Sequence, residues 1–205
     1  MEKRVICCIG DSLTEGDYGM YGVTGVANVH EKNYPYFLAK ELKCETRNYG
    51  RCGLRADQYL DYYMENNLDM SDADIVMIML GTNGGHSVTE DTVPNESYKK
   101  LIKVIQKDAP KAKVILVTPP YVTANPEFAN HWYRTHVEVS VEFVRNVAEQ
   151  EDVYLIDAAK YEEFNEETVK IYQKNDGLHY VEEGYQEMAR FFSRKIKEFF
   201  PEMFG

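Results

Sequence analysis

Short apolar runs alternate along the chain with segments in which apolar residues recur every three or four positions. The apolar runs cover residues 4–10, 44–50, 73–81, 113–120 and 153–158, and their length is typical of buried β-strands. The segments between and after them carry apolar stripes at helical spacing. These stripes are Phe37, Leu38 and Leu42; Tyr98, Leu101, Ile102 and Ile105; Val137, Val141, Val144 and Ala148; and Met188, Phe191, Phe192, Ile196 and Phe199.

Strands that alternate with amphipathic helices predict a parallel sheet covered on both faces, which is an α/β three-layer sandwich. The run at 44–50, CETRNYG, is the least apolar, so we place it at the edge of the sheet. This predicts about five strands in the order 2-1-3-4-5, with functional groups at their carboxyl ends. A length of 205 residues suits a single domain, 1–205.

The charge and hydropathy of the chain argue against nucleic acids and membranes as partners. The chain has 23 Lys and Arg against 34 Asp and Glu, a formal net charge of −11, which repels nucleic acids and anionic membrane surfaces. The longest apolar stretch, residues 75–80, is far shorter than the ~20 residues of a membrane span. The apolar segment 5–9 is too short for the core of a secretion signal. We therefore expect a cytoplasmic protein without membrane insertion and without a nucleic-acid partner.

The four cysteines show no spacing typical of a metal site. Cys7 and Cys8 are adjacent on a predicted strand and should point to opposite faces, and Cys44 and Cys52 are not paired in a C-x-x-C motif. We expect reduced thiols that fill space and no zinc site.

Polar and glycine residues follow the first three predicted strands. Ser12 comes just after the first strand, Gly50 and Gly53 end or follow the second, and Asn83 follows the third. Because these strands are neighbours in the order 2-1-3, we expect their tips to meet at one rim. A hydroxyl, a backbone N–H from a glycine turn and a side-chain amide are the groups that acyl transfer requires.

A serine nucleophile needs a base, and the base needs an orienting group. Of the five histidines, His179 stands apart because it follows the last predicted strand and has Asp176 three residues before it. A loop with this spacing can bring the carboxylate to the far ring nitrogen. The other histidines are more often solvated or packed than catalytic, and we assign no role to them: His30, His86, His131 and His136.

Four blocks of the chain together resemble the SGNH, or GDSL, hydrolases. They are GDSL at 10–13, NYGRCG at 48–53, GTN at 81–83 and DGLH at 176–179, in the family's order. Each block alone is common. Their combination at the expected strand ends identifies the chain as similar to this family, which implies a flavodoxin-like fold and ester hydrolysis without a metal or organic cofactor.

The resemblance also implies roles for individual residues. Ser12 resembles the nucleophile, His179 the base and Asp176 its partner. The backbone N–H groups of Ser12 and Gly53 and the side chain of Asn83 resemble the oxyanion hole, with Gly53 preferred to Gly50 because it falls five residues after Asn48. The third block departs from the usual Gly-x-Asn-Asp, because Gly84 stands where the family commonly has an acid.

Each of these residues also has an ordinary structural explanation. Asp11 and Ser12 are common in turns and helix caps, and glycines serve tight turns. Asn83 between Thr82 and Gly84 is good turn chemistry, and Asp176 and His179 could be loop residues before a helix. Only their joint occurrence favours catalysis.

Substrate identity is the least determined part of the sequence. The segment 119–136 contains Phe128, Trp132 and Tyr133, and Trp132 and Tyr133 are our candidates for contact with substrate. The same aromatic residues could instead cover the core. The glycine-rich segment 18–33 could form a lid or rim. We expect a small-molecule partner, a small soluble acyl or acetyl ester such as an acetylated sugar.

Several alternatives stay open at this point. A lysophospholipase, a thioesterase or an acyltransferase could use the same triad. A non-catalytic flavodoxin-like domain could bind an anion with Ser12 and Gly53, although neither a P-loop nor a dinucleotide fingerprint is present. The sequence leaves the oligomeric state open.

Overall fold

The computed structural model describes residues 3–19 and 27–204. They contain a five-stranded parallel sheet in the order β2-β1-β3-β4-β5, which confirms the predicted fold class and strand order. The strands are β1 (Val5–Gly10), β2 (Glu45–Gly50), β3 (Ile75–Met79), β4 (Lys113–Val117) and β5 (Tyr154–Ile156).

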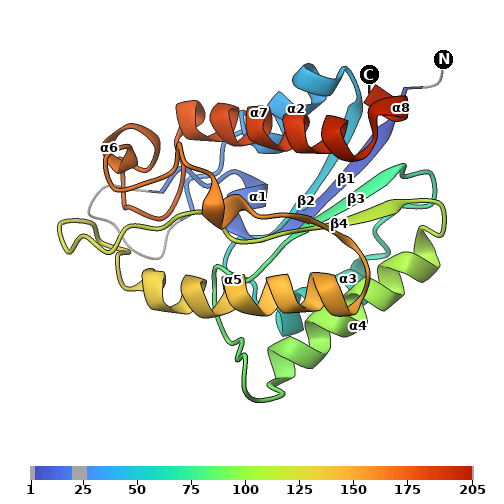
Figure 1. Cartoon of the computed structure of the whole chain (residues 1–205), viewed down its shortest axis with the longest axis horizontal. Helices are drawn as coiled ribbons and strands as arrows, with labels where there is room; N and C mark the ends of the chain where they lie inside the picture. The colour runs from blue at the N-terminus through green and yellow to red at the C-terminus, as the bar shows by residue number, and fades with distance from the viewer. Residues whose placement is uncertain (1–2, 20–26, 205) are drawn as a thin grey trace.

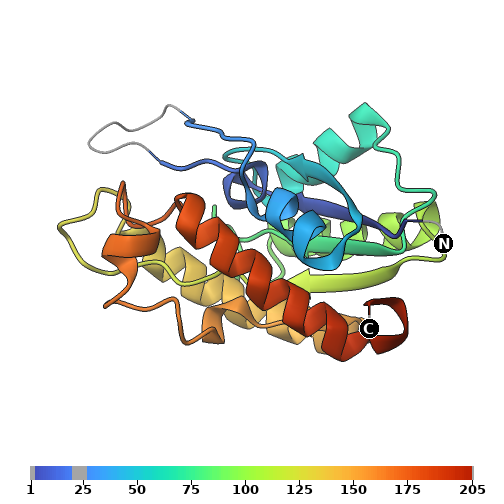
Figure 2. The same cartoon turned by 90° about the horizontal axis from the view of Figure 1, so that it is seen from above.

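Helices cover both faces of the sheet (Figures 1 and 2). The longer ones are α2 (Tyr34–Leu42), α3 (Ala56–Asn66), α4 (Val93–Asp108), α5 (Tyr133–Gln150) and α7 (Glu182–Phe199). Short ones are α1 (Ser12–Glu15), the 3₁₀ helix η1 (Ala158–Lys160), α6 (Val169–Tyr172) and α8 (Pro201–Phe204). The apolar stripes predict α2, α4, α5 and α7. They miss α3, in which two of the four buried residues are tyrosines.

Alternation along the central strands divides the core into two layers. In β1, Ile6 and Cys8 face α2 and α7, whereas Cys7 and Ile9 face α3, α4 and α5. The two adjacent cysteines therefore point to opposite faces, as expected, and both are buried free thiols. Cys52 is only half-buried and lies at the rim where β2 ends.

Register aligns the carboxyl ends of the three strands that carry the candidate residues. Gly10 of β1 is paired with Gly50 of β2 on one side and with Met79 of β3 on the other. The chain segments that follow these strands therefore leave the sheet at the same level. No helix of the described residues is long and apolar enough to cross a membrane.

A close backbone contact requires glycine at the end of β2. A Cβ atom on Gly50 would lie 2.1 Å from the backbone nitrogen of Glu15 in α1. In contrast, a Cβ atom on Gly53 would meet nothing within 4 Å, although its φ of +77° is unfavourable for other residues.

We predict that Gly50→Ala lowers the free energy of unfolding by about 3 kcal/mol, because α1 must move away from β2. Gly53→Ala is the matched control and should cost only about 1 kcal/mol, from backbone strain. Urea denaturation measures both variants. Equal losses would contradict the tight contact between β2 and α1.

Candidate active site

Three side chains from opposite ends of the chain form a continuous hydrogen-bonded line. Ser12 Oγ lies 3.0 Å from His179 Nε2, and His179 Nδ1 lies 2.6 Å from Asp176 Oδ2. Ser12 and Asp176 are buried, and the His179 side chain is 14% exposed. One short loop thus supplies both Asp176 and His179, and it brings the carboxylate to the ring nitrogen that faces away from Ser12.

Local structure explains how Ser12 is presented. Asp11 is the N-cap of α1, and its Oδ1 accepts a hydrogen bond from the backbone N–H of Leu13 at 3.0 Å. Ser12 is thus the first residue of α1, directly beyond β1, and its own N–H has no acceptor within the helix. The ordinary capping role belongs to Asp11, which leaves the Ser12 hydroxyl directed at His179.

The loop that carries Asp176 and His179 is held by its neighbours. Asp176 Oδ1 accepts from the N–H groups of Leu178 at 3.0 Å and His179 at 2.8 Å. Asn130 donates from Nδ2 to Asp176 Oδ2 at 3.0 Å, and its backbone N–H donates to the Asp176 carbonyl, also at 3.0 Å. The carboxylate is therefore fixed before any substrate binds.

Asn130 is a functional candidate that the sequence reasoning missed. It lies in the segment 119–136, in which the sequence indicates only the aromatic residues as candidates for contact with substrate. An asparagine in a polar loop carries no periodicity, and its contact with Asp176 depends on how two distant loops pack. No sequence signal marks it.

Gly53 and Asn83 follow the ends of β2 and β3, which the register aligns with the end of β1. The Asn83 amide donates to the carbonyl of Leu54 at 3.0 Å, which ties the tip of β3 to the loop after β2. Glu15 secures the same loop, because its Oε2 accepts from the Cys52 N–H at 2.5 Å and its Oε1 pairs with Arg51. Glu15 is a second residue that the sequence did not single out.

His136 occupies the space next to Gly84. A Cβ atom on Gly84 would lie 3.0 Å from His136 Nδ1, and Gly84 has a φ of +71°. The ring of His136 from α5 therefore packs against the loop at Gly84, the position where the resemblance leads us to expect an acid. The rings of Trp132 and Tyr133 lie next to His136, and their own centroids are 4.0 Å apart.

The candidate substrate contacts differ in exposure. Trp132 is 52% exposed, whereas Phe128 is buried against Gly177 in the loop that carries Asp176 and His179. Burial raises the pKa of Tyr133, and the charges of Asp11 and Asp176 raise it further. Phe128 thus has the structural role that the sequence left open, while Trp132 is free to contact a ligand. Part of the segment 18–33, residues 20–26, lies outside the described residues.

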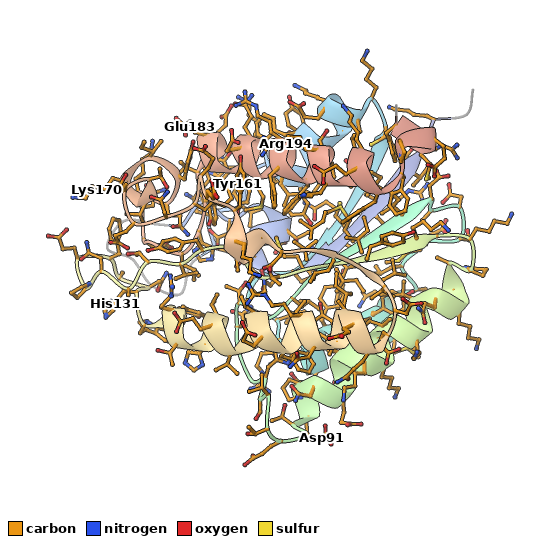
Figure 3. All side chains as sticks on the ribbon, viewed as in Figure 1. Asp91, His131, Tyr161, Lys170, Glu183 and Arg194 are labelled. Carbon is orange, nitrogen blue, oxygen red and sulfur yellow. The ribbon has the colours of Figure 1, made fainter. Side chains whose placement is uncertain are left out.

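The other histidines are separate from this line of side chains. His86 donates or accepts at Nδ1 with Asn95 and stacks on Phe143, and burial lowers its pKa to about 4. His131 bonds the Phe128 carbonyl in the loop before α5, where Figure 3 labels it. His30 stacks on Tyr18.

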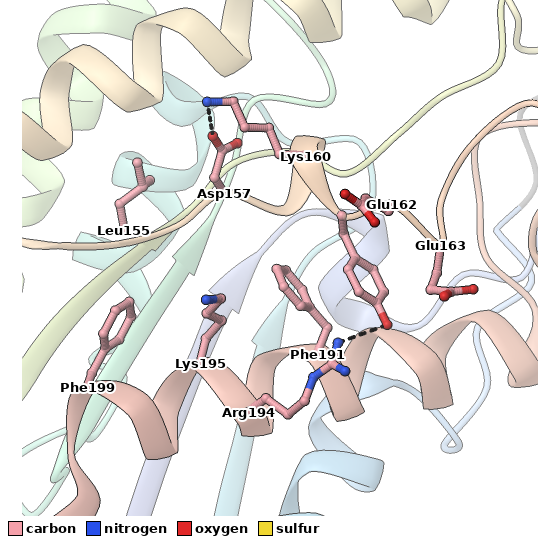
Figure 4. Close-up of a pocket in the computed structure, with 10 residues that line it drawn as sticks. Leu155, Asp157, Lys160, Glu162, Glu163, Phe191, Arg194, Lys195 and Phe199 are labelled. Atoms are coloured by element: carbon pink, nitrogen blue, oxygen red, sulfur yellow. Dashed lines mark hydrogen bonds and ion pairs between the residues drawn. The ribbon is translucent and has the colours of Figure 1, made fainter.

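A cavity of about 530 Å³ at the β5 edge does not contain the candidate residues. Figure 4 shows its walls, which come from β5, from η1 and the residues on either side of it, and from α7. Arg194 donates to the Tyr161 hydroxyl at 3.1 Å, and Tyr161 stacks on Phe191. These contacts tie the residue that follows η1 to α7, so the side chains have a packing role.

The sequence matches the model of the GDSL-like Lipase/Acylhydrolase family over residues 8–187. The chain belongs to this family. As a member, it is a hydrolase that acts on ester bonds. The matched region contains Ser12, Asn83, Asp176 and His179, and it ends within α7. No curated protein sequence matches the chain.

Solved structures share the fold at low sequence identity. A lipase/acylhydrolase from Enterococcus faecalis is 21% identical with a TM-score of 0.69, and the alignment covers 95% of this chain and 96% of that one. A carbohydrate acetylesterase from Sinorhizobium meliloti is 20% identical with a TM-score of 0.73, over 97% and 100%. The aryl esterase of M. smegmatis is 19% identical with a TM-score of 0.68, over 95% and 99%.

The surroundings of His179 act on its pKa in opposite directions. Burial opposes a charge on the ring and lowers the pKa. The hydrogen bond and charge of Asp176 outweigh this effect, with smaller contributions from Asp17 and Asp11, and the pKa is raised above its ordinary value of 6.5. The site therefore stabilises an imidazolium.

We predict that the His179 ring titrates with a midpoint above 6.5 and that Asp176→Asn lowers this midpoint, because the amide supplies no negative charge. NMR titration of the ring resonances measures both values. A wild-type midpoint below 6.5 would mean that burial prevails over the carboxylates.

Proposed function

We propose that Ser12, His179 and Asp176 are a catalytic triad that hydrolyses carboxylic esters through an acyl-enzyme. The observation that carries this proposal is the hydrogen-bonded line from Ser12 Oγ through both nitrogens of His179 to Asp176 Oδ2. Each group in the line matches the role that serine catalysis needs: a hydroxyl, a base, and a carboxylate that fixes the tautomer of the base.

In the first half of the reaction, Ser12 Oγ attacks the ester carbonyl carbon and His179 Nε2 takes the hydroxyl proton. The carbonyl oxygen becomes an oxyanion, for which the donors are the N–H groups of Ser12 and Gly53 and the Asn83 amide. His179 then gives its proton to the leaving alcohol as the ester C–O bond breaks.

In the second half, water takes the place of the alcohol. His179 accepts a proton from the water as its oxygen attacks the acyl carbon, and the bond to Ser12 Oγ breaks as the serine regains a proton. Asp176 stays ionised and stabilises the imidazolium in both halves. The raised pKa of His179 supports this role.

For the substrate, we propose a small acyl or acetyl ester such as an acetylated sugar. Acidic groups around the site, Asp11, Asp17 and Asp176, disfavour anionic substrates. The exposed indole of Trp132, which is tilted against the ring of Tyr133, offers an apolar face for a sugar ring. The fold shared with a carbohydrate acetylesterase is consistent with this class.

We predict that Ser12→Ala and His179→Ala each lower kcat/KM for p-nitrophenyl acetate by roughly 10⁴-fold, because each removes one member of a unit that acts together. Ser71→Ala is the matched control, since Ser71 is exposed and precedes β3 at the other end of the strands. Wild-type activity in purified Ser12→Ala would rule out the triad.

We also predict that Asn83→Ala lowers kcat by about 10² to 10³ with little change in KM, because the lost donor acts on the oxyanion and not on the ground-state ester. Steady-state kinetics with the same ester give both constants. Asn66→Ala, at the exposed end of α3, is the control. A change in KM alone would assign Asn83 to substrate binding.

A further inference from the structure

A second carboxylate faces the catalytic histidine from the side of the proposed nucleophile. Asp17 Oδ2 lies 3.8 Å from His179 Nε2, the nitrogen that also faces Ser12. The Asp17 side chain is only 7% exposed. The triad and the oxyanion hole do not use it, because Asp176 already orients His179 from the opposite nitrogen.

The position of Asp17 is fixed from several directions. Its Oδ1 accepts from the backbone N–H groups of Gly19 and Asn28, both at 2.9 Å. Its backbone carbonyl accepts from the buried hydroxyl of Tyr185 at 2.7 Å, and its backbone forms a bridge with Val29. Such anchoring holds the carboxylate in one orientation, with Oδ1 toward the chain and Oδ2 toward His179.

Within the described part of the chain, Oδ2 has weak partners only. Cys52 Sγ lies 3.9 Å away, and a thiol is a poor donor. The separation from His179 Nε2 is well beyond the 2.7–2.9 Å of a charge-assisted hydrogen bond. Oδ2 therefore keeps capacity to accept a hydrogen bond from a bound molecule.

The location of Oδ2 indicates which part of a substrate it would meet. During catalysis the leaving oxygen of the ester must come within hydrogen-bond reach of His179 Nε2, which protonates it. A hydroxyl on the next carbon of the alcohol lies about one hydrogen-bond length from that oxygen. Such a hydroxyl is therefore in reach of Asp17 Oδ2.

We propose that Asp17 is a specificity-determining residue. It selects esters whose alcohol half carries a hydroxyl on the carbon adjacent to the one that bears the ester oxygen. The Asp17 Oδ2 accepts the hydrogen bond from that hydroxyl. This inference rests on the proposed function, because it assumes that His179 Nε2 protonates the leaving oxygen.

Charge favours a neutral donor over an ionic group at this position. An anionic group next to the ester oxygen is repelled by Asp17 and Asp176. A cationic group would be attracted to Asp17, but it would lie beside the positive charge that develops on His179 in the transition state. A neutral hydroxyl donates the hydrogen bond and is repelled neither by the carboxylates nor by the imidazolium. Esters of sugars and polyols carry such a hydroxyl on the carbon adjacent to the one that bears the ester oxygen.

The test compares two acetate esters that differ in one group. The terminal hydroxyl of 2-hydroxyethyl acetate is replaced by a methyl group in propyl acetate, and acetate release measures kcat/KM for each. We predict that the wild type prefers the hydroxyl ester by about 10-fold or more, since the hydrogen bond is to a charged acceptor. The ratio of the two values cancels any common effect on the triad.

The variant Asp17→Asn isolates the acceptor atom. The N–H groups of Gly19 and Asn28 keep the amide oxygen in the place of Oδ1, so the amide NH₂ group faces His179 as a donor instead of an acceptor. We predict that the preference falls to near one. Asp91→Asn, in the exposed loop before α4 (Figure 3), is the matched control and should keep the wild-type ratio.

Two results would overturn the proposal: a wild-type ratio near one, or the same preference in Asp17→Asn as in the wild type. Acetylcholine adds a third comparison, because it has a charge but no donor on the alcohol half. If Asp17→Asn reduces its kcat/KM as much as that of the hydroxyl ester, charge and not a hydrogen bond is responsible, and the proposal is wrong.

Two further measurements keep the result interpretable. The wild-type ratio alone tests the proposal if Asp17→Asn does not fold. Ser12→Ala, assayed with the hydroxyl ester, separates this inference from the proposed function. Retained hydrolysis in Ser12→Ala refutes the triad. If Ser12→Ala is inactive but Asp17→Asn keeps the wild-type ratio, only the role of Asp17 is refuted.

Discussion

The alignment of three strand ends is the constraint on which the site depends. Gly10, Gly50 and Met79 are neighbours in the sheet register, and the segments beyond them carry Ser12, Gly53 and Asn83. The alignment requires a close contact between β2 and α1, which leaves no room for a side chain on Gly50. Asn48 strengthens it, because its side chain donates to the carbonyl of Thr14 and accepts from the Gly50 N–H. The geometry around Ser12 thus follows from backbone packing.

A second constraint is the concentration of carboxylates around one imidazole. Asp176 bonds His179 directly, Asp17 faces its other nitrogen, and Asp11 is fully buried beside Ser12. Burial raises the pKa of Asp11 to about 6, an effect that its bond to Leu13 and the nearby His179 partly offset. Together these acids oppose the cost of charging a buried histidine, and they shape the electrostatics that a substrate meets.

The fold was predictable from sequence because buried strands and amphipathic helices leave periodic signals. The candidate residues could be named because they stand in four sequence blocks that resemble a known family. Strand order followed from the weak apolar character of 44–50, and Asp176 lies close to His179 because three residues separate them. The helix α3 was missed because two of its four buried residues are tyrosines, which weakens the apolar stripe. Asn130, Glu15 and Asp17 were missed for a different reason. Their importance comes from contacts between segments that are distant in sequence, such as Asn130 with Asp176 and Glu15 with Cys52, and no spacing records such contacts.

We propose that Ser12 is the group that becomes covalently bonded to the acyl carbon. A fluorophosphonate reacts with an activated serine and stays attached to it, so peptide mass spectrometry after labelling identifies the nucleophile directly. We predict a single phosphonylated residue, Ser12, and loss of labelling in His179→Ala, where the hydroxyl has no base. Labelling of a different residue, or undiminished labelling of Ser12 in His179→Ala, would contradict it.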